Sequence, residues 1–563
     1  MAIEHVKTAP TKREPSEVEG LRAIVTRLRE EGRVDDAFEH SFTAIHAVLA
    51  RMRVLELKIA DMRRTALGQT SERIDSQQLE LLMEEFAALE ATAAKGEPVS
   101  TEEEAREDAV LDEELAEARE NQKTARAGTA PDGDGDRKHK KRRGIDTSTA
   151  DVEETTSELS ELDRTHPESG IVGRLIGHDT IERLEYEPGR FLLHVTKVAR
   201  YGFGGDGSGG IISAPAPVKV IPRALAGASL LADIIVSKHA DHLPLYRLHE
   251  RYLRAGIDIS RSTLAEWYAD TCDTLAPIAQ RLFERVLEAI VVRIDASGLK
   301  VQDPSVVKNI VRGTMWCLVG DDRDVVFRYT ANGKGDTGPW QFLAGRSGYI
   351  QADGANIFDR LYNGRVGTAI EVGCNTHARR NFVKIMGSDT RVALVLQLYG
   401  RLYKVERLAK LRNLDPAGIL ALRRQYSVGI ADRLYRWLAK HAKDDPPDSS
   451  FAKAIAYAIN HRKALTRFLE DGRLDIDNNI CEQQIRALAL GRKNFLFAGS
   501  HEAAERLAIG YTLTRTCAMH GVPPLPYLTD VLEKLAGGWP NSRLDELLPD
   551  QWLKLHGPTV LAR

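Results

Sequence analysis

From residue 290 onward the chain alternates short apolar runs with short amphipathic runs, and two of the apolar runs end in an aspartate. IVVRIDASGL carries Asp295 at the end of its apolar part, and SGYIQADG carries Asp353 in the same position. Runs of this length that are rich in β-branched and aromatic residues are typical of strands. Two further strands, GTMWCLVG and DVVFRYT, are predicted on either side of a DDRD turn.

Helical runs complete this pattern. TGPWQFLAG, NIFDRLY and NTHARRNFVKIM predict helices, and TAIEVGC predicts one more strand. The order β-β-β-α-β-α-β-α is that of a ribonuclease-H-like α/β domain. In that fold the first and fourth strands are neighbours, so we expect Asp295 and Asp353 to lie close together. Two such acids are weak evidence by themselves, because a strand-end aspartate often caps a following turn.

A third acid lies on a predicted helix far along the chain. In RLDIDNNICEQQIRALALGRKNFLF, Asp477 or Asn478 can cap a helix, and Glu482 falls on its first turns. Crowded together, Asp295, Asp353 and Glu482 would repel one another without a counter-ion. Two Mg²⁺ ions, with Mn²⁺ as a substitute, would satisfy that charge through oxygen ligands. We therefore expect the three acids to be metal ligands and catalytic residues of phosphodiester chemistry, in which two ions activate the attacking oxygen and neutralise the leaving one.

Basic residues follow the third acid. Arg486 lies four residues after it, on the same face of the helix, and Arg492 and Lys493 follow in a GRKN motif. The run NTHARRNF adds a second basic cluster with Arg379 and Arg380. We expect these five side chains to contact DNA phosphates near the scissile bond.

Several motifs resemble those of the insertion sequence sixty-six transposase family. They are HLPLYR, STLAEW, CNTHARRNF, RFLEDGRLDIDNNICEQQIRALALGRKNFLFAGS, and PPLPYLTDVLEKLAGGWP followed by RLDELLPDQW. The resemblance extends from about residue 40 to the C-terminus and is strongest over 220–552. It implies a DDE transposase whose acidic triad maps onto Asp295, Asp353 and Glu482, with a largely helical insertion between the second and third acids. The helical pattern over 390–470 fits that insertion.

The chain departs from the family pattern at two places. Family members commonly carry a four-cysteine zinc module before the catalytic domain, whereas HPESG and YGFGGDGSGG stand at its positions here. All four ligands are absent, so we expect no structural zinc and altered DNA recognition. The first acid is usually followed by another acid and a threonine, whereas Ala296 and Ser297 follow Asp295 here. Because of these departures, a catalytically impaired DNA-binding relative of such a transposase is an alternative interpretation of the chain.

The N-terminal part, residues 1–95, predicts a helical and coiled-coil region. Apolar residues recur at spacings of three and four from Ile45 to Ala66, a heptad seam that fits either a dimer contact or a helix packed on its own chain. Residues 96–168 combine an acidic block over 101–120 with the basic run RKHKKRR. Such blocks of like charge predict a disordered charged linker.

Six further parts complete the predicted organisation. They are a small β-rich module (169–222), a helical DNA-binding or pre-catalytic region (223–289), the first part of the catalytic core (290–389), the helical insertion (390–470), the third-acid helix with its basic motif (471–500) and a helical C-terminal region (501–563). Gly202, Gly204 and Gly207 match a dinucleotide-binding pattern, but an extended segment follows where that site needs a helix. We therefore expect a glycine turn there. The run ISRSTLAEW predicts Ser262 or Thr263 as a helix N-cap.

Composition narrows the possibilities further. No apolar run is long enough to cross a membrane and the N-terminus lacks the apolar core of a secretory signal, so we expect a cytoplasmic protein. The five cysteines are far apart, which excludes a CxxC zinc motif and predicts reduced, mostly buried thiols. The net charge is −3, yet the block over 101–120 contains ten acids and two arginines, so the rest of the chain is basic.

These features predict a transposase of a bacterial insertion sequence, which binds the ends of the element and catalyses metal-dependent DNA cleavage and strand transfer. DNA is the expected partner, both as element end and as target. Because two DNA ends must be joined, we also expect a homo-oligomer, with accessory proteins of the same element as further partners. A ribonuclease-H-like nuclease that hydrolyses DNA without joining it is an alternative, as is the impaired relative.

Overall fold

The computed structural model describes residues 25–31, 34, 38, 102–127, 191–195, 200–202, 211–213, 217–222, 224–321, 323–331, 337–386 and 389–557. The chain forms two compact units. The insertion unit comprises Gly373–Asp477 together with the N-terminal residues up to Ala130. The sheet unit comprises the chain from Pro131 to Val372 together with Asn478 onward. The insertion unit therefore interrupts the sheet unit in sequence.

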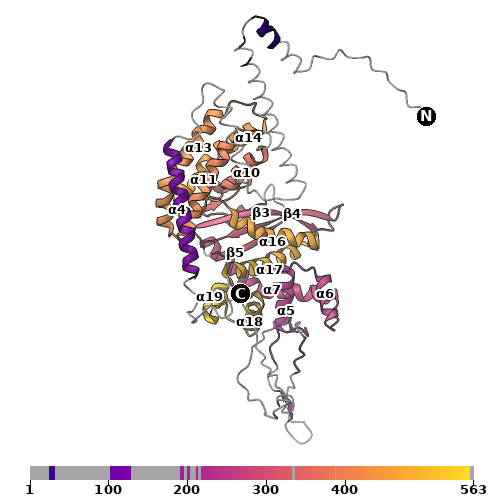
Figure 1. The fold of residues 1–563 in the computed structure, drawn as a ribbon. Helices are drawn as coiled ribbons and strands as arrows, with labels where there is room; N and C mark the ends of the chain where they lie inside the picture. The colour runs from indigo at the N-terminus through magenta and orange to yellow at the C-terminus, as the bar shows by residue number, and fades with distance from the viewer. Residues whose placement is uncertain are drawn as a thin grey trace, which may run out of the picture. The chain divides into compact units, whose positions relative to one another are not determined.

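The sheet unit is built on a five-stranded mixed sheet with the strand order β5-β4-β3-β6-β7. Figure 1 labels three of these strands, β3, β4 and β5. The strands are β3 (Val291–Gln302), β4 (Ile310–Val319), β5 (Val325–Thr330), β6 (Tyr349–Gln351) and β7 (Ile370–Val372). β3, β4 and β5 pair antiparallel, whereas β6 and β7 run parallel to β3. The predicted mixed α/β character is confirmed, and so is the adjacency of the first and fourth strands of this region.

Short helices occupy the predicted connections between these strands. α8 (Trp340–Leu343) precedes β6, and a 3-10 turn with α9 (Asp359–Tyr362) precedes β7. α10 (Asn375–Ile385) follows β7 in the chain and belongs to the insertion unit. The order of strands and helices expected from residue 290 onward is therefore present.

β3 is longer than its sequence pattern indicated. We expected the strand to end at Asp295, but it continues to Gln302 as an antiparallel hairpin with β4, in which Gln302 lies opposite Ile310. Leu299 and Val301 explain the extension, because both are fully buried on one face of the hairpin. Burial of alternate residues fixes the register of such a strand.

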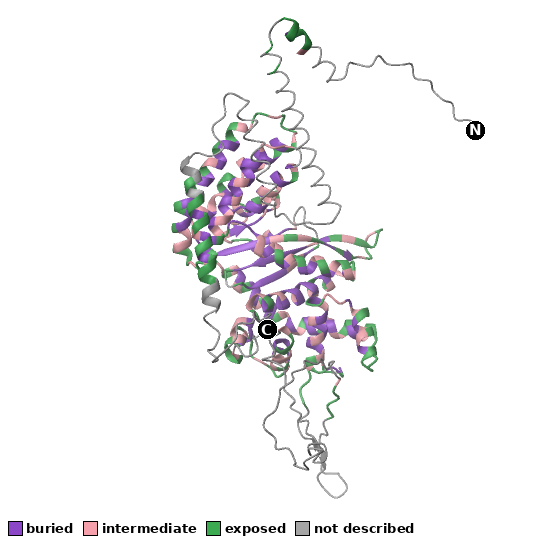
Figure 2. Cartoon of the chain, in the orientation of Figure 1, coloured by how far each residue is buried: buried purple, intermediate pink, exposed green. Residues whose placement is uncertain are grey.

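Three helices cover the two faces of this sheet: α7 (Arg261–Glu288), α16 (Asn479–Phe495) and α17 (His501–His520). On one face, Val292 and Trp316 share an apolar cluster with the buried residues of α7. On the other face, Leu299 and Met315 pack with α16 and α17. Figure 2 shows the buried residues concentrated along the strands and the helix sides that contact them. The sheet is therefore the middle layer of an α/β/α arrangement.

Further helices of the sheet unit precede α7 and follow α17. They are α5 (Ala228–His239), α6 (Leu245–Arg254), α18 (Pro524–Ala536) and α19 (Pro549–His556), with a 3-10 segment at Asn541–Leu547. These helices lie within 223–289 and 501–563, the ranges for which helical regions were expected. α18 packs on α5, so the last helices of the chain contact the first helices of this unit.

The N-cap of α7 differs from the prediction. Ser260, rather than Ser262 or Thr263, occupies this position and accepts a hydrogen bond from the Thr263 backbone N at 3.1 Å. Ile259 before the cap and Leu264 in the first turn are both buried in the same apolar cluster. An apolar pair at these two positions fixes where a chain enters a helix, which explains the earlier start.

The outer edge of β5 is closed by a helix instead of a strand. The backbone N–H groups of Val325 and Phe327 donate to the hydroxyls of Thr516 and Thr512 at 3.0 and 2.9 Å. These two threonines lie one turn apart on α17 and are buried. Edge N–H groups that would otherwise attract another strand are thereby satisfied.

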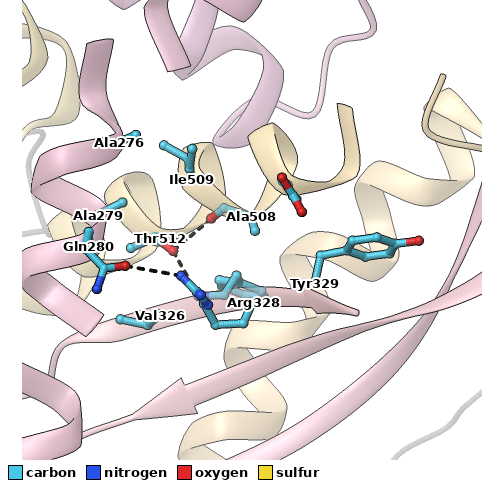
Figure 3. A pocket seen from close by; sticks show the side chains of 11 residues that line it. Ala276, Ala279, Gln280, Val326, Arg328, Tyr329, Ala508, Ile509 and Thr512 are labelled. Atoms are coloured by element: carbon cyan, nitrogen blue, oxygen red, sulfur yellow. Dashed lines mark hydrogen bonds between the residues drawn. The ribbon is translucent and has the colours of Figure 1, made fainter. Parts of the chain in front are cut away.

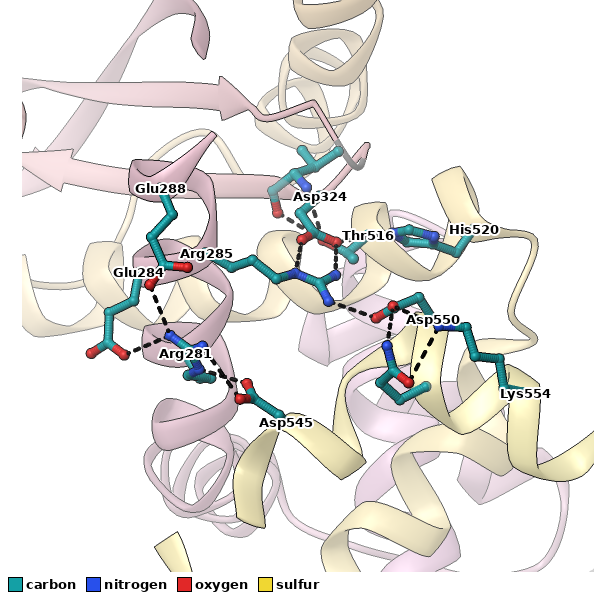
Figure 4. Close-up of polar contacts among 12 residues, drawn as sticks. Arg281, Glu284, Arg285, Glu288, Asp324, Thr516, His520, Asp545, Asp550 and Lys554 are labelled. Atoms are coloured by element: carbon teal, nitrogen blue, oxygen red, sulfur yellow. Dashed lines mark hydrogen bonds and ion pairs between the residues drawn. The ribbon is translucent and has the colours of Figure 1, made fainter. Parts of the chain in front are cut away.

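A buried carboxylate joins α7 to the C-terminal part of the sheet unit. Arg285 donates to both oxygens of Asp324 and, at 2.9 Å, to Asp550 (Figure 4). His520 contacts Asp324 at 2.9 Å. Asp324 is only 1% exposed, so its charge depends on these partners. We call these four residues the Asp324 clasp.

The insertion unit is helical throughout its described residues. Besides α10 it contains α11 (Val392–Leu411), α12 (Pro416–Leu422), α13 (Val428–His441), α14 (Ser450–Asn460) and α15 (Arg462–Leu465). These helices lie in the chain between the second and third acids, where the helical insertion was expected. α10 packs on α11 and α14, so the compact unit begins at Gly373 and is larger than the expected 390–470.

A long acidic helix corrects part of the prediction of a disordered linker. α4 (Glu102–Ala127) contains the acidic block and packs on α11. Leu111, Leu115 and Ala118 are its buried residues. Two ion pairs strengthen the contact, Asp112 with Lys404 at 2.7 Å and Glu114 with Arg412 at 3.1 Å. These buried residues are four and three positions apart, so they form an apolar stripe on one side of the helix. The many charged residues around them led to the prediction of disorder.

Other predicted features lie outside the described residues. They are the heptad seam from Ile45 to Ala66, the rest of the linker over 96–168 and most of the module over 169–222. Within that module, β1 (Arg200–Gly202) pairs antiparallel with β2 (Ile211–Ser213). A strand therefore follows the glycine cluster, as expected, and not the helix that a dinucleotide site requires.

All five cysteines are buried free thiols, as predicted. Across the described part of the chain, no helix combines the length and the apolar character that a membrane crossing needs.

Candidate active site

Asp295 lies on β3, and Asp353 follows the end of the neighbouring parallel strand β6. β3 and β6 pair in register, with Arg293 opposite Gln351, and each aspartate lies two residues further along its own chain. On the other side of β6, the Ala352 backbone N donates to the Val372 carbonyl of β7 at 3.1 Å. Neighbouring strands are about 4.8 Å apart. The register therefore gives the two acids corresponding positions, two residues after the last paired residues, and their proximity remains a prediction.

Backbone groups orient both carboxylates. Oδ1 of Asp295 accepts a hydrogen bond from the Ala296 backbone N at 2.7 Å. Oδ1 of Asp353 accepts one from the Ala355 backbone N at 3.0 Å, in the turn that leads to the 3-10 segment before α9. Both aspartates are half-buried. Because the first bond uses a main-chain donor, the presence of alanine after Asp295 leaves this orientation available.

The first turn of α16 is attached directly to β3. Asn478 occupies the N-cap position, as predicted, but its side chain caps nothing: Nδ2 donates to the Ile294 carbonyl at 2.8 Å. The Cys481 thiol donates to a β4 carbonyl at 3.1 Å. Glu482 follows on the same turn and is half-buried. Since Ile294 immediately precedes Asp295, these bonds hold the turn that carries Glu482 beside the strand of the first acid.

The charges of Asp295 and Asp353 affect the pKa values of two neighbouring side chains. Burial raises the pKa of the Cys481 thiol, and the negative charge of Asp295 adds to that effect. Burial also raises the pKa of the Tyr362 phenol, and the charges of Glu371 and Asp353 raise it further. The first acid therefore lies near α16 and the second near α9, both at the edge of a low-dielectric interior.

Within the insertion unit, the entering and leaving chain segments are tied together. Asn375 at the start of α10 donates from Nδ2 to the Ile476 carbonyl at 3.0 Å, and its backbone N donates to the same carbonyl at 3.1 Å. The Thr376 hydroxyl donates to Asp477 at 3.0 Å. Asp477, which we considered as a helix cap, therefore accepts from a threonine of α10. These bonds fix the residues that immediately precede Asn478 in the chain.

The expected phosphate-binding residues are divided between the two units. In the sheet unit, Arg486 and Lys493 are exposed on α16. Arg492 is half-buried and donates to the Gly298 carbonyl on β3, a structural contact that its position in a basic motif did not predict. Arg379 and Arg380 are half-buried on α10 of the insertion unit.

Asn478 and Cys481 are positioning residues that the sequence did not reveal in that role. Asparagine before a helix normally indicates a cap, and a cysteine within an amphipathic pattern indicates burial. The only available signal for Cys481 was its place on the apolar side of α16. No local signal indicated that Asn478 would donate to a β3 carbonyl.

A separate cavity of about 290 Å³ lies between α7, β5 and α17 (Figure 3). Arg328 and Tyr329 of β5 line it together with Glu505 of α17, and Arg328 contacts Gln280 at 3.4 Å. It contains none of the three acids or five basic residues expected at the active site. We therefore do not assign it to the candidate active site.

Comparison with known proteins identifies relatives of this chain. Residues 223–506 match the model of the Transposase IS66 family, and residues 512–549 match the IS66 C-terminal element. The uncharacterized protein y4qI of Sinorhizobium fredii is 36% identical over 396 residues, which cover 68% of this chain and 72% of the relative. The uncharacterized protein y4hP of the same organism is 30% identical over 535 residues, which cover 90% of each chain.

The first family match contains Asp295, Asp353 and Glu482 together with the whole helical insertion between the last two. The second match covers the C-terminal part of α17 and all of α18, which belong to the sheet unit. Both the core and the C-terminal element are thus accounted for, and the chain belongs to the IS66 family of transposases.

Proposed function

We propose that this protein binds the ends of a bacterial insertion sequence and catalyses metal-dependent DNA cleavage and strand transfer in a ribonuclease-H-like sheet unit. Asp295, Asp353 and Glu482 are the proposed catalytic residues and metal ligands. The observation that supports the proposal is the in-register pairing of β3 with β6, because Asp295 and Asp353 each follow the last paired residue of their own segment by two positions. Attachment of the third-acid helix to β3 through Asn478 supports it.

The residues present fit a pair of hard divalent cations. The proposed donors are carboxylate oxygens, which Mg²⁺ and Mn²⁺ prefer. The nearby Cys481 thiol donates a hydrogen bond to the Cys317 carbonyl of β4. This bond directs the thiol toward the sheet. When bound, two such ions would activate the attacking oxygen and neutralise the leaving oxygen of a phosphodiester.

The protein's own groups would hold and orient the reactants. The backbone N–H donors of Ala296 and Ala355 fix one oxygen of each aspartate. Arg486 and Lys493, exposed on the helix that carries Glu482, are proposed to contact DNA phosphates. Arg379 and Arg380 are proposed as further phosphate contacts, and Arg492 as a residue that supports the basic motif through its bond to β3.

Cleavage of a labelled duplex that carries the DNA flanking the gene tests the proposal. Asp295→Asn, Asp353→Asn and Glu482→Gln should each lower the Mg²⁺-dependent rate by more than about 100-fold, because even partners of metal ligands typically contribute 10- to 100-fold. Asp359→Asn and Glu505→Gln are matched controls, since both acids are exposed in the same unit. Their rates should stay within about two-fold of the parent.

Near-parental cleavage by any one of the three variants would remove that residue from the proposed site. Equal losses in the two controls would indicate a general charge effect instead. Mn²⁺ should support cleavage by the parent protein. Purified protein should contain no stoichiometric zinc, as the missing cysteine ligands predict.

A further inference from the structure

The turn after α16 holds an exposed leucine in an unfavourable backbone conformation. Leu496 has φ 65° and ψ −44°, and the Phe497 backbone N donates to the Phe495 carbonyl at 2.7 Å. This is a γ-turn of the rare kind, with a positive φ at a residue that has a branched side chain. Such conformations cost about 1–3 kcal/mol and persist only where surrounding contacts impose them.

The contacts that impose this turn come from β3. The Ala498 backbone N donates to the Lys300 carbonyl at 2.9 Å, and the Gln302 backbone N donates to the Ala498 carbonyl at 2.8 Å. Ala498 thereby forms a parallel bridge with Val301. Both residues are buried in the apolar cluster beneath α16 and α17. The chain after the turn is thus held against β3 by a single bridge residue.

Phe497 immediately precedes Ala498, and its side chain is exposed. Lys300 lies on the face of β3 opposite to Val301, because the side chains of neighbouring strand residues alternate and Val301 belongs to the buried cluster. The register places Arg312 of β4 directly opposite Lys300. Both basic residues are exposed, and Phe497 is 41% exposed.

The result is an aromatic ring at the edge of an exposed sheet face that also carries two cations. Leu496 beside it is 65% exposed, and Lys493 is exposed on the last turn of α16. An exposed aromatic residue surrounded by basic ones is the usual composition of a surface that stacks unpaired bases and binds the adjoining phosphates. Exposure of Leu496 and Phe497 to water does not stabilise the strained turn. A bound partner that contacts these two side chains would explain their exposure.

We propose that Phe497, with Lys300 and Arg312, forms a binding site for an unpaired DNA strand, in which a base stacks on the Phe497 ring. This inference rests on the proposed function, because it assigns the site to the same DNA that Asp295 would cut. Five residues of β3 separate Asp295 from Lys300, which corresponds to about 17 Å along the strand. A few nucleotides of single strand can cover that distance.

Binding of fluorescein-labelled oligonucleotides to the full-length protein tests this site. A 20-nucleotide single strand of mixed sequence and the matching duplex are the two probes, with fluorescence anisotropy as the readout. Phe497→Ala should weaken single-strand binding about 10-fold, within the range for loss of one base–aromatic stack, and change duplex binding less than two-fold. Phe497→Trp should retain single-strand affinity because it retains a stacking surface.

Leu525→Ala is the matched control, since Leu525 is also 41% exposed in the sheet unit. It should bind both probes as the parent does. Lys300→Gln with Arg312→Gln should reduce the salt dependence of single-strand binding. Unchanged single-strand affinity in Phe497→Ala, or an equal loss for both probes, would overturn the stacking site. Failure of the parent protein to bind any DNA would instead overturn the proposed function.

Discussion

Single side chains at the candidate active site act mainly by joining elements that are far apart in sequence. Asn478 crosses from the start of α16 to the Ile294 carbonyl, next to Asp295. Asn375 makes the corresponding link in the insertion unit, where it holds Ile476 beside the start of α10. Both amides are nearly fully buried, so an unpaired donor or acceptor there would cost about 1–3 kcal/mol.

At the same scale, Leu496→Gly tests whether the turn after α16 is strained. Glycine adopts a positive φ without steric cost, and Leu496 loses little burial because its side chain is 65% exposed. We expect the variant to be as stable as the parent or more stable, by up to about 1–2 kcal/mol in urea unfolding. A control is Leu490→Gly, which removes another exposed leucine, 51% exposed, from within α16.

The control should lose about 1 kcal/mol, the ordinary cost of glycine inside a helix. Equal destabilisation by both substitutions would show that Leu496 is not strained. A gain in stability with a loss of single-strand DNA binding would show that the strained residue is retained for binding.

The sequence allowed the three acids to be selected, because strand pattern, helix pattern and motif agreed at those positions. It could not specify Asn478 as a link to β3, since the Ile294 carbonyl that it binds is distant in sequence. For the same reason Arg492 was expected at DNA, whereas its guanidinium also donates to Gly298. Exposed Arg486 and Lys493 remain as predicted, without an observation that tests their contact with DNA.

At the scale of helices and strands, the predictions failed where burial depended on a distant partner. Charge blocks predicted disorder over 96–168, but α4 gains a partner in α11, which follows it by nearly three hundred residues. β3 was expected to end at Asp295, but its hairpin with β4 is covered by α16 and α17. In both cases the sequence contained regularly spaced apolar residues. The sequence did not indicate which distant helices would bury them.

The Asp324 clasp provides a test at this scale, because it joins α7 to helices that follow β5. Burial alone would raise the pKa of Asp324, but hydrogen bonds from His520 and Arg285 outweigh it and hold the pKa below the ordinary 3.8. Since the pKa is lower in the folded state, the ionised carboxylate stabilises the fold above pH 3.8, and this contribution is lost as the pH falls through the lower, folded-state value.

Asp324→Asn should therefore destabilise the protein by about 3 kcal/mol at pH 7, the usual result of removing one member of a buried ion pair. The difference from the parent should shrink as the pH falls below 3.8. Urea unfolding at a series of pH values measures it. A difference that grows as the pH falls below 3.8 would contradict the assigned sign of the pKa shift.

At the scale of the whole molecule, the chain places a helical unit between the second and third acids and returns to the same sheet. The insertion leaves after β7 and its chain re-enters at Asn478, where α16 is attached to β3. Family membership and the helical insertion were both predictable from sequence. Pairing of two DNA ends requires an oligomer, and the heptad seam from Ile45 to Ala66 remains the proposed contact for it.

Joining of DNA strands distinguishes a transposase from a nuclease with the same three acids. The most direct measurement supplies a pre-cleaved, labelled element end with a free 3′-hydroxyl, a supercoiled target plasmid and Mg²⁺. We expect the parent protein to join the labelled strand covalently to the plasmid, and Glu482→Gln to bind the end but form no joined product. Hydrolysis by the parent without any joined product, or joining by Glu482→Gln at the parental rate, would contradict the assignment of these acids to strand transfer.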